Sequence, residues 1–156
     1  MYLDKIKQQL QQLGLVKPDE FVGCTTDELN RLEEELGISL PKSYQEFMLW
    51  MGNGAGQFLR GSDCFFQHIS YLREWAIELL EENNFPEALP DDAFIFFMHQ
   101  GYQFSFFRLS EGDEPPIYYY CEGENKTSFT NSHKKFSDFL VKEIDIHAKQ
   151  MMVASS

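Results

Sequence analysis

The sequence has 156 residues, a length that suits one domain, and a formal net charge of −12 at pH 7. Because binding to DNA or RNA needs a basic stripe and the sequence contains none, we expect no direct nucleic-acid partner. No apolar run approaches the roughly 18 residues of a transmembrane helix, and the N-terminus lacks the layout of a signal peptide, so we expect no membrane association.

The N-terminal segment, residues 1–24, is predicted to form a helix and a connection. Ile6, Leu10 and Leu13 lie on one side of a helix over residues 2–13, and a glycine follows it. The rest of the segment links this helix to the body of the protein. We expect the segment to pack on that body as an accessory element.

A capped helix is predicted next. Thr25 and Glu28 have the spacing of a capping box, in which the hydroxyl accepts a hydrogen bond from the first turn and the glutamate reaches back to the threonine N–H. The apolar stripe of this helix consists of Leu29, Leu32 and Leu36. Gly37 closes the helix.

A short and mostly buried helix follows. Pro41 fits its first helical position, because the missing proline N–H removes no internal hydrogen bond there. The apolar face of this helix consists of Tyr44, Phe47, Met48 and Met51. Gly52 suits a left-handed C-terminal cap, and the glycine-rich loop over residues 52–56 is too flexible to continue a regular element.

Short strands and a longer helix are expected in the next thirty residues. Residues 57–67 are predicted to hold one or two strands, around residues 58–59 and 64–66. Ser70 is predicted to cap the helix that follows, and the asparagines and proline of residues 83–86 end it. The apolar pattern of this helix consists of Leu72, Trp75, Ala76, Leu79 and Leu80.

The second half of the chain reads as an antiparallel meander. Residues 93–98 are apolar on both faces, which predicts a central strand. A turn at residues 99–101 leads to a strand over residues 102–107. Residues 117–121 are rich in β-formers and predict a third strand, and residues 126–130 are a candidate for a fourth.

A final helix is predicted over residues 134–150, followed by a frayed tail at residues 151–156. One face of this helix consists of Phe136, Phe139, Leu140, Ile144 and His147. We therefore predict a single α+β domain over residues 1–156, in which an antiparallel meander of about four to six strands packs with helices from both ends of the chain.

Acidic residues suggest where a partner binds. Antiparallel neighbours place the start of one strand and the end of the next at the same edge, which brings the Asp91–Asp92 turn beside the loop after the second strand. The candidate partner-binding residues are Asp91, Asp92, Glu111, Asp113 and Glu114. Glu122 and Glu124 lie about 17 Å further along the third strand and form a separate patch. The acidic balance favours a basic partner, or serves solubility alone.

Catalytic, cofactor and metal sites are not expected. Cys64 and His68 make one poorly spaced pair of potential zinc ligands, with His99 and Cys121 elsewhere. The sequence has neither a nucleophile elbow nor a phosphate-binding glycine loop. An enzyme would need an enclosed pocket with a strongly perturbed acid or histidine. Three widely spaced cysteines do not suggest a disulfide framework and favour a cytoplasmic protein.

The order of these features over residues 25–140 resembles that of the SUKH superfamily, the Smi/Knr-type proteins. The signature residues are Leu36, Gly37, Leu40, Pro41, Tyr44, Phe47 and Gly52. Arg108 departs from the pattern, because relatives often carry an acidic residue near the end of that strand.

This resemblance implies a non-enzymatic protein that binds other proteins. Many members are bacterial immunity proteins, so it implies neutralisation of a cognate toxin domain, often a nuclease, that presents a basic surface. The alternative that it implies is a regulatory or scaffold protein related to fungal regulators of cell-wall glucan synthesis. Neither reading specifies the oligomeric state.

Overall fold

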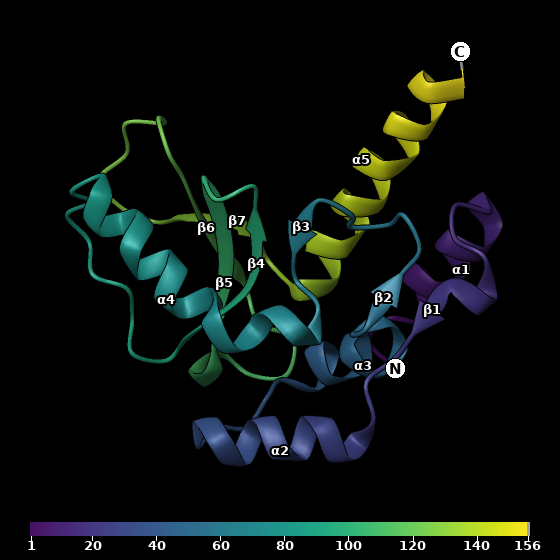
Figure 1. Ribbon diagram of the computed structural model, residues 1–156, viewed down its shortest axis with the longest axis horizontal. Coiled ribbons are helices and arrows are strands. Elements are labelled where there is room, and N and C mark those ends of the chain that lie inside the picture. The colour runs from purple at the N-terminus through teal and green to yellow at the C-terminus, as the bar shows by residue number, and fades with distance from the viewer. Residues whose placement is uncertain (156) are drawn as a thin grey trace.

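A five-stranded antiparallel sheet in the order β3–β4–β5–β6–β7 forms the centre of the protein (Figure 1). The computed structural model describes residues 1–155. The strands are β3 (Ser62–Asp63), β4 (Ala93–His99), β5 (Gln103–Arg108), β6 (Ile117–Cys121) and β7 (Thr130–His133). A small second sheet pairs β1 (Phe21–Val22) with β2 (Gly54–Ala55). The predicted α+β fold with an antiparallel meander is confirmed.

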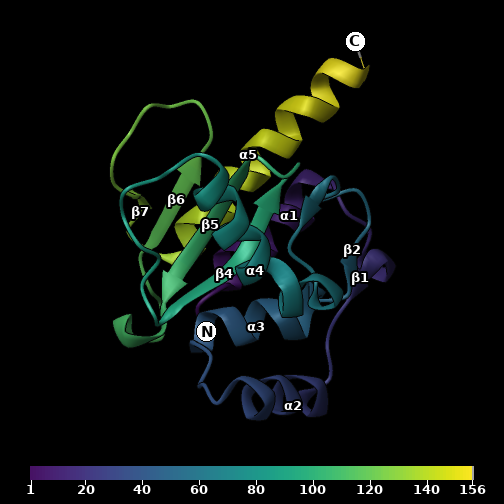
Figure 2. The same cartoon turned by 60° about the vertical axis from the view of Figure 1, so that its left-hand side comes forward.

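Helices cover both faces of the large sheet. The helices are α1 (Asp4–Leu13), α2 (Thr26–Leu36), α3 (Lys42–Met51), α4 (Phe66–Glu82) and α5 (Phe136–Ser155), with short 3₁₀ turns η1 (Pro18–Glu20) and η2 (Leu109–Glu111). Figures 1 and 2 show α4 over one face of the sheet and α5 behind the other. Within residues 1–155, no helix is long and apolar enough to span a membrane.

Tyr44 on α3 stands at the centre of an aromatic core. Its side chain is completely buried, and its ring centroid lies 5.4 Å from that of Phe94, 5.2 Å from that of Phe107 and 5.6 Å from that of Phe136. These rings come from α3, β4, β5 and α5, so a single side chain joins two helices to the sheet. The predicted buried face of α3 is confirmed.

The hairpin between β4 and β5 follows the sequence pattern. Six consecutive residues of β4, 93–98, are buried, as expected for a strand covered on both faces. Gln100 and Gly101 both have positive φ, at 50° and 78°, which matches the right-handed twist of the flanking strands. The predicted turn at residues 99–101 is therefore confirmed.

Two predictions about the ends of α3 are wrong. Pro41 is the N-cap residue, because the helix begins at Lys42. Gly52 has a right-handed conformation with φ −61°, and glycine is required there for space. A Cβ at Gly52 would lie 2.5 Å from Cys24 Sγ and 2.6 Å from the Met48 carbonyl oxygen. Gly37 does adopt the left-handed cap at the end of α2, with φ 64°.

The predicted short strands and their neighbouring cap are also misplaced. Residues 58–59 form a turn instead of a strand, and Leu59 has a positive φ of 61°. Residues 64–66 lead directly into α4, so Ser70 lies inside the helix and does not cap it. The first turn is instead closed by His68, whose Nδ1 accepts a hydrogen bond of 3.2 Å from the Phe65 N–H.

The strand and helix of the C-terminal third begin and end a few residues away from their predicted bounds. The fourth strand of the meander is β7 at residues 130–133 instead of residues 126–130. The last helix begins at Phe136 and continues through residues 151–155, which are therefore helical and not frayed. Ser156 lies outside the described residues.

Three apolar side chains predicted on buried faces are exposed. Leu13 and Leu36 are each 47% exposed and Trp75 is 41% exposed. The two leucines are the last residues of α1 and of α2, each followed by a left-handed glycine cap. Trp75 lies on the outer side of α4, beside Tyr71.

Candidate protein-binding surface

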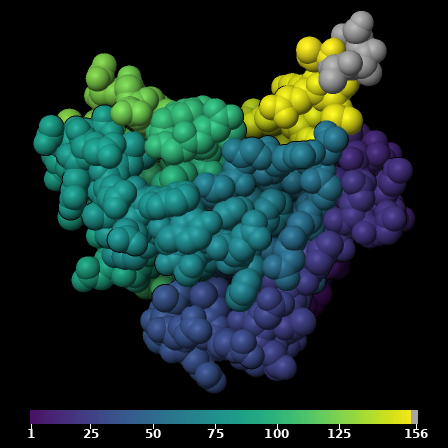
Figure 3. Space-filling view, in the orientation of Figure 1, coloured from purple at the N-terminus to yellow at the C-terminus, as the bar shows by residue number. Residues whose placement is uncertain are grey.

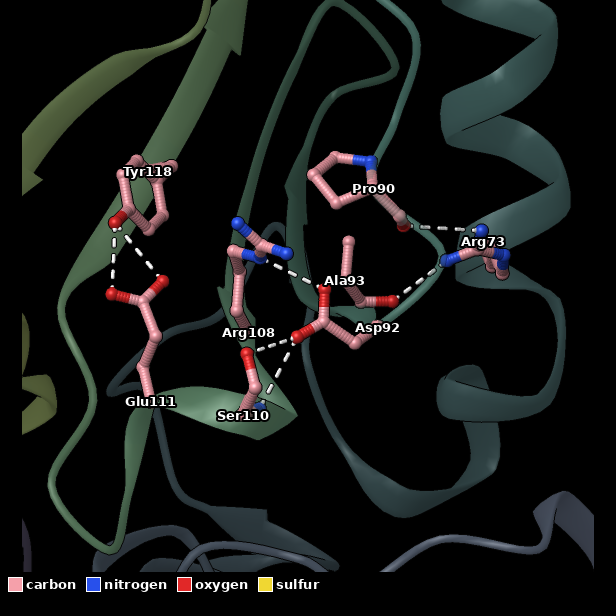
Figure 4. Close-up of polar contacts among 8 residues, drawn as sticks. All are labelled: Arg73, Pro90, Asp92, Ala93, Arg108, Ser110, Glu111 and Tyr118. Atoms are coloured by element: carbon pink, nitrogen blue, oxygen red, sulfur yellow. Dashed lines mark hydrogen bonds and ion pairs between the residues drawn. The ribbon is translucent and has the colours of Figure 1, made fainter.

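Of the five predicted acidic residues, Asp92 and Glu111 lie at one edge of the large sheet, where β4 begins and β5 ends (Figure 4). Asp91 and Asp92 precede β4, and the loop that follows β5 carries the other three. The N–H of Leu109 donates to the Asp92 carbonyl oxygen at 3.0 Å, which fixes the two segments side by side. The structure therefore places the aspartate turn beside the acidic loop, as predicted.

Asp92 is held by Arg108 and Ser110 (Figure 4). Arg108 Nε donates to Asp92 Oδ1 at 2.8 Å, and the Ser110 N–H and hydroxyl both donate to Asp92 Oδ2. The Ser110 hydroxyl, followed by Arg108, lowers the pKa of Asp92 below its usual range despite partial burial. The arginine that departs from the family pattern thus pairs with a neighbouring aspartate.

Glu111 is oriented by Tyr118 on β6. The Tyr118 hydroxyl donates to the two Glu111 carboxylate oxygens at 3.0 and 3.1 Å. Burial and this carboxylate together raise the pKa of Tyr118 above its ordinary value. Tyr118 therefore remains a neutral donor at pH 7, and its hydroxyl orients the Glu111 side chain at the edge of the sheet.

Asp113 and Glu114 bind the N-termini of two helices. Asp113 Oδ1 accepts from the Lys42 N–H at 3.2 Å, and the Asp113 carbonyl oxygen accepts from the Ser43 N–H at 3.0 Å, at the start of α3. Glu114 Oε1 accepts from the Ser137 N–H at 3.3 Å and from the Ser137 hydroxyl, at the start of α5. Negative charge at a helix N-terminus is favourable, so both residues stabilise the fold.

We expect Asp113→Ala and Glu114→Ala each to lower the free energy of unfolding by about 1 kcal/mol, because each removes a cap from a helix N-terminus. Urea unfolding followed by circular dichroism measures the change. Asp91→Ala is the matched control, since the Asp91 side chain is exposed and no hydrogen bond to it occurs within residues 1–155. Equal stability of all three variants would contradict the capping roles.

The second acidic patch lies at the other end of β6, as predicted. Glu124 accepts a hydrogen bond of 2.8 Å from the Tyr119 hydroxyl and lies 3.8 Å from Lys126 Nζ. Lys126 Nζ also donates to the Tyr119 hydroxyl at 3.2 Å. A cavity of about 410 Å³ separates this group from the C-terminal end of α4. Lys126 partly neutralises the patch, which makes it less acidic than its sequence suggests.

The outer face of α4 is a surface that sequence reasoning missed. The rings of Tyr71 and Trp75 lie against each other with centroids 4.5 Å apart. Exposed carboxylates continue along the same helix: Glu74, Glu78, Glu81 and Glu82. Sequence reasoning assigned Trp75 to the buried stripe because its spacing fits both faces. Acidic residues on either side of Trp75 were the available signal for an outer position.

Arg73 connects another side of α4 to the acidic edge (Figure 4). Its guanidinium donates to the Ala93 carbonyl oxygen at 2.7 Å and to the Pro90 carbonyl oxygen at 3.4 Å. These two carbonyl groups flank Asp91 and Asp92 in the sequence. Because Arg73 is two positions from both Tyr71 and Trp75, it points to nearly the opposite side of the helix, and the aspartate turn is held beside that side of α4.

The predicted poor pair of zinc ligands does not form a site. His68 Nδ1 is occupied by the Phe65 N–H, and His68 Nε2 lies 3.5 Å from Asp63 Oδ1. The Cys64 thiol is buried, and burial raises its pKa far above the ordinary value, so it stays protonated. In the part of the chain that the structure describes, no group of three His, Cys, Asp or Glu residues has the geometry to hold a metal ion.

Comparison with known protein families gives a match over most of the chain. A sequence model of the SMI1/KNR4 family (SUKH-1) matches residues 23–142. The match includes α2 to β7, the beginning of α5 and all five predicted partner-binding residues, and it leaves α1 outside. No curated protein sequence matches the chain.

Proposed function

Because this chain belongs to the SMI1/KNR4 family (SUKH-1), we propose that it is a non-enzymatic binding protein that neutralises a bacterial toxin domain in the cytoplasm by direct contact. The net charge of −12 favours a partner with a basic surface, since opposite charges steer the encounter. Nucleases present such surfaces to their polyanionic substrates, which makes a nuclease domain the expected partner class.

The observation that carries the proposal is the outer face of α4. Buried interfaces are anchored by a few large side chains, and tryptophan and tyrosine are the residues most enriched among such anchors. Trp75 is 41% exposed and its ring already lies against that of Tyr71, so its rotamer is partly fixed before binding. The surrounding glutamates supply the charge that attracts a basic partner.

The acidic edge, with Asp91, Asp92 and Glu111, lies beside the Arg73 side of α4 and is a second candidate contact area. The Asp92 carboxylate is fixed by Arg108 and that of Glu111 by Tyr118, and Arg73 holds the backbone on either side of the aspartate turn. A surface that is ordered before binding loses less conformational entropy on association. Figure 3 shows that α4 and the loop before it make up much of one face of the molecule, which gives the partner a continuous area to cover.

The test is coexpression with the C-terminal domain encoded beside this gene, followed by binding of the purified pair. We expect this protein to restore growth, and Trp75→Ala to weaken binding by about 30-fold, the typical effect of losing an interface anchor. Leu49→Ala is the matched control, because Leu49 is 46% exposed on α3 and not on α4.

Each outcome of this test bears on a different part of the proposal. Absence of both rescue and binding would overturn the toxin-neutralising function. Rescue with unchanged binding by Trp75→Ala would keep the function and move the interface away from α4. Glu74→Lys with Glu78→Lys should slow association more than it speeds dissociation, because charges at the rim of an interface act mainly on the encounter rate.

A further inference from the structure

A groove of about 450 Å³ lies between α4 and the segment that joins α4 to β4. It follows the side of the helix that carries Arg73, and Ile77, about one turn further along, lies on the same side. Trp75 is two positions from both residues and therefore points to nearly the opposite side of the helix. The groove is thus separate from the aromatic pair on the outer face of α4.

The second wall of the groove is residues 85–89, which are ordered by contacts of their own. In Figure 1 this segment leads from the C-terminal end of α4 back towards the start of β4. The Phe85 N–H donates to the Leu80 carbonyl oxygen at 3.0 Å, and the Glu87 carboxylate accepts from the Phe129 N–H at 2.9 Å. A groove whose walls are fixed before binding loses less conformational entropy when it is filled.

The groove presents apolar side chains to solvent. Leu80 is buried, with 7% of its surface exposed, while Phe85 and Leu89 are half-buried. Ile77 is 37% exposed and Ala88 is exposed as well. Covering this apolar surface with another apolar side chain would be favourable, because it removes both from water.

Carboxylates stand on both sides of the groove. The exposed carboxylates of the helix between the groove and the outer face are Glu74, Glu78 and Glu81. Glu87 is exposed on the opposite wall. Arg73 is the cation of the lining, and its guanidinium donates to two backbone carbonyl groups. An apolar groove between carboxylates favours an occupant that is apolar in the middle and basic on either side.

We propose that this groove binds a short segment of the basic protein partner, in which a large apolar side chain stands between lysines or arginines. The apolar side chain covers Ile77 and Leu89, and the flanking cations meet Glu81 and Glu87. The groove thereby gives the partner of the proposed function, on which this assignment rests, a point of attachment beside the outer face of α4. A second copy of this chain is opposed by its own net charge of −12.

The test follows the methyl groups of Ile77 and Leu89 by NMR while peptides are added. The lining extends from Arg73 to Asn84, about 16 Å of helix, which corresponds to about five extended residues. The probe is acetyl-Lys-Lys-Leu-Lys-Lys-amide, and two matched peptides replace the leucine by serine or the lysines by glutamate. We expect the probe to shift both methyl resonances and to bind at least about tenfold more tightly than either matched peptide.

Three variants decide whether binding belongs to this groove. Ile77→Ser should weaken probe binding by at least about fivefold, because it removes an apolar wall. Ile146→Ser is the matched control, since Ile146 is 38% exposed and lies on α5. Glu81→Gln should weaken binding by about threefold, and this difference should vanish at high salt. Circular dichroism verifies that each variant is folded.

Several results would overturn the proposal. One is the absence of any shift of the two methyl groups with the probe. Another is unchanged probe binding by Ile77→Ser. A third is a dimer in sedimentation that Ile77→Ser dissociates, which would show that a second copy fills the groove.

Failure of the proposed function gives a different result. Probe binding in the groove without rescue of growth would overturn the toxin-neutralising function and support a basic partner of another kind. Rescue together with toxin binding that Ile77→Ser leaves unchanged would keep the function and overturn the role of the groove.

Discussion

Replacement of Tyr44 by alanine is expected to lower the free energy of unfolding by about 4 kcal/mol, the usual cost of removing a buried aromatic ring. Tyr44 is completely buried and packs against rings from β4, β5 and α5, so the vacated space cannot be filled from one side alone. Urea unfolding at pH 7 measures the loss. Tyr102→Ala is the control, since Tyr102 is 38% exposed and should cost less than about 1 kcal/mol.

Tyr44→Phe separates the ring from its hydroxyl. Among the described residues the buried Tyr44 hydroxyl has no hydrogen-bond partner. Removing an unsatisfied buried hydroxyl is expected to raise the free energy of unfolding by about 1 kcal/mol. Opposite signs for the alanine and phenylalanine variants would support a purely apolar role for the ring. A loss of stability in Tyr44→Phe would show that the hydroxyl is used.

Gly23→Ala should cost about 3 kcal/mol or more, because the added atom meets backbone. A Cβ at Gly23 would lie 1.8 Å from the Leu49 carbonyl oxygen, so the segment before α2 would have to leave the end of α3. The next residue, Cys24, donates its N–H to the Met48 carbonyl oxygen at 2.8 Å, and this bond would be strained too.

Gly14→Ala provides the comparison for Gly23→Ala. Nothing lies within 4 Å of a Cβ at Gly14, and its φ of 63° is the only obstacle to alanine. We expect it to cost about 1 kcal/mol, the usual penalty for alanine in the left-handed region. Thermal and urea unfolding of both variants test the difference, and similar losses at the two positions would contradict the close approach at Gly23.

Features governed by local interactions were predictable from the sequence. The Thr25 hydroxyl accepts from the Glu28 N–H at 3.1 Å, and Glu28 accepts from the Thr25 N–H at 2.9 Å, as the spacing required. The buried face of α3 and the β4–β5 turn followed in the same way from periodicity and from glycine. Each of these depends on residues within one or two turns of each other.

Features governed by distant contacts were not predictable. Glu46 looks like an ordinary surface residue of α3, yet it is buried and accepts the N–H groups of Tyr2 and Leu3 at 3.0 and 3.2 Å. It thereby holds the start of α1, which the sequence identified only as an accessory helix. For Gly52 the sequence predicted a left-handed cap. It could not show the real reason for glycine, the close approach of Cys24, because Cys24 is distant in the sequence.

The candidate surface was predicted in composition but not in detail. Charge and strand order correctly brought Asp91 and Asp92 next to the acidic loop. The sequence had no means of showing that Arg108 neutralises Asp92, or that two of the loop carboxylates cap helices, because these pairings depend on side-chain positions across strands. Trp75 fits the period of both helix faces, so only the packed structure assigns it to the outside.

The adjacent residues Asp113 and Glu114 constrain the order in which the helices of this protein can fold during synthesis. Asp113 caps a helix that begins 71 residues earlier, and Glu114 binds Ser137, 23 residues later, in the first turn of α5. On the ribosome, α3 therefore emerges long before Asp113, its capping residue, has been synthesised. The loop that contains Glu114 in turn emerges before α5, to which it binds. Because contacts between distant segments form slowly, folding is completed only once the last helix has left the exit tunnel. A shortened nascent chain would lack both the cap and the core that α5 closes.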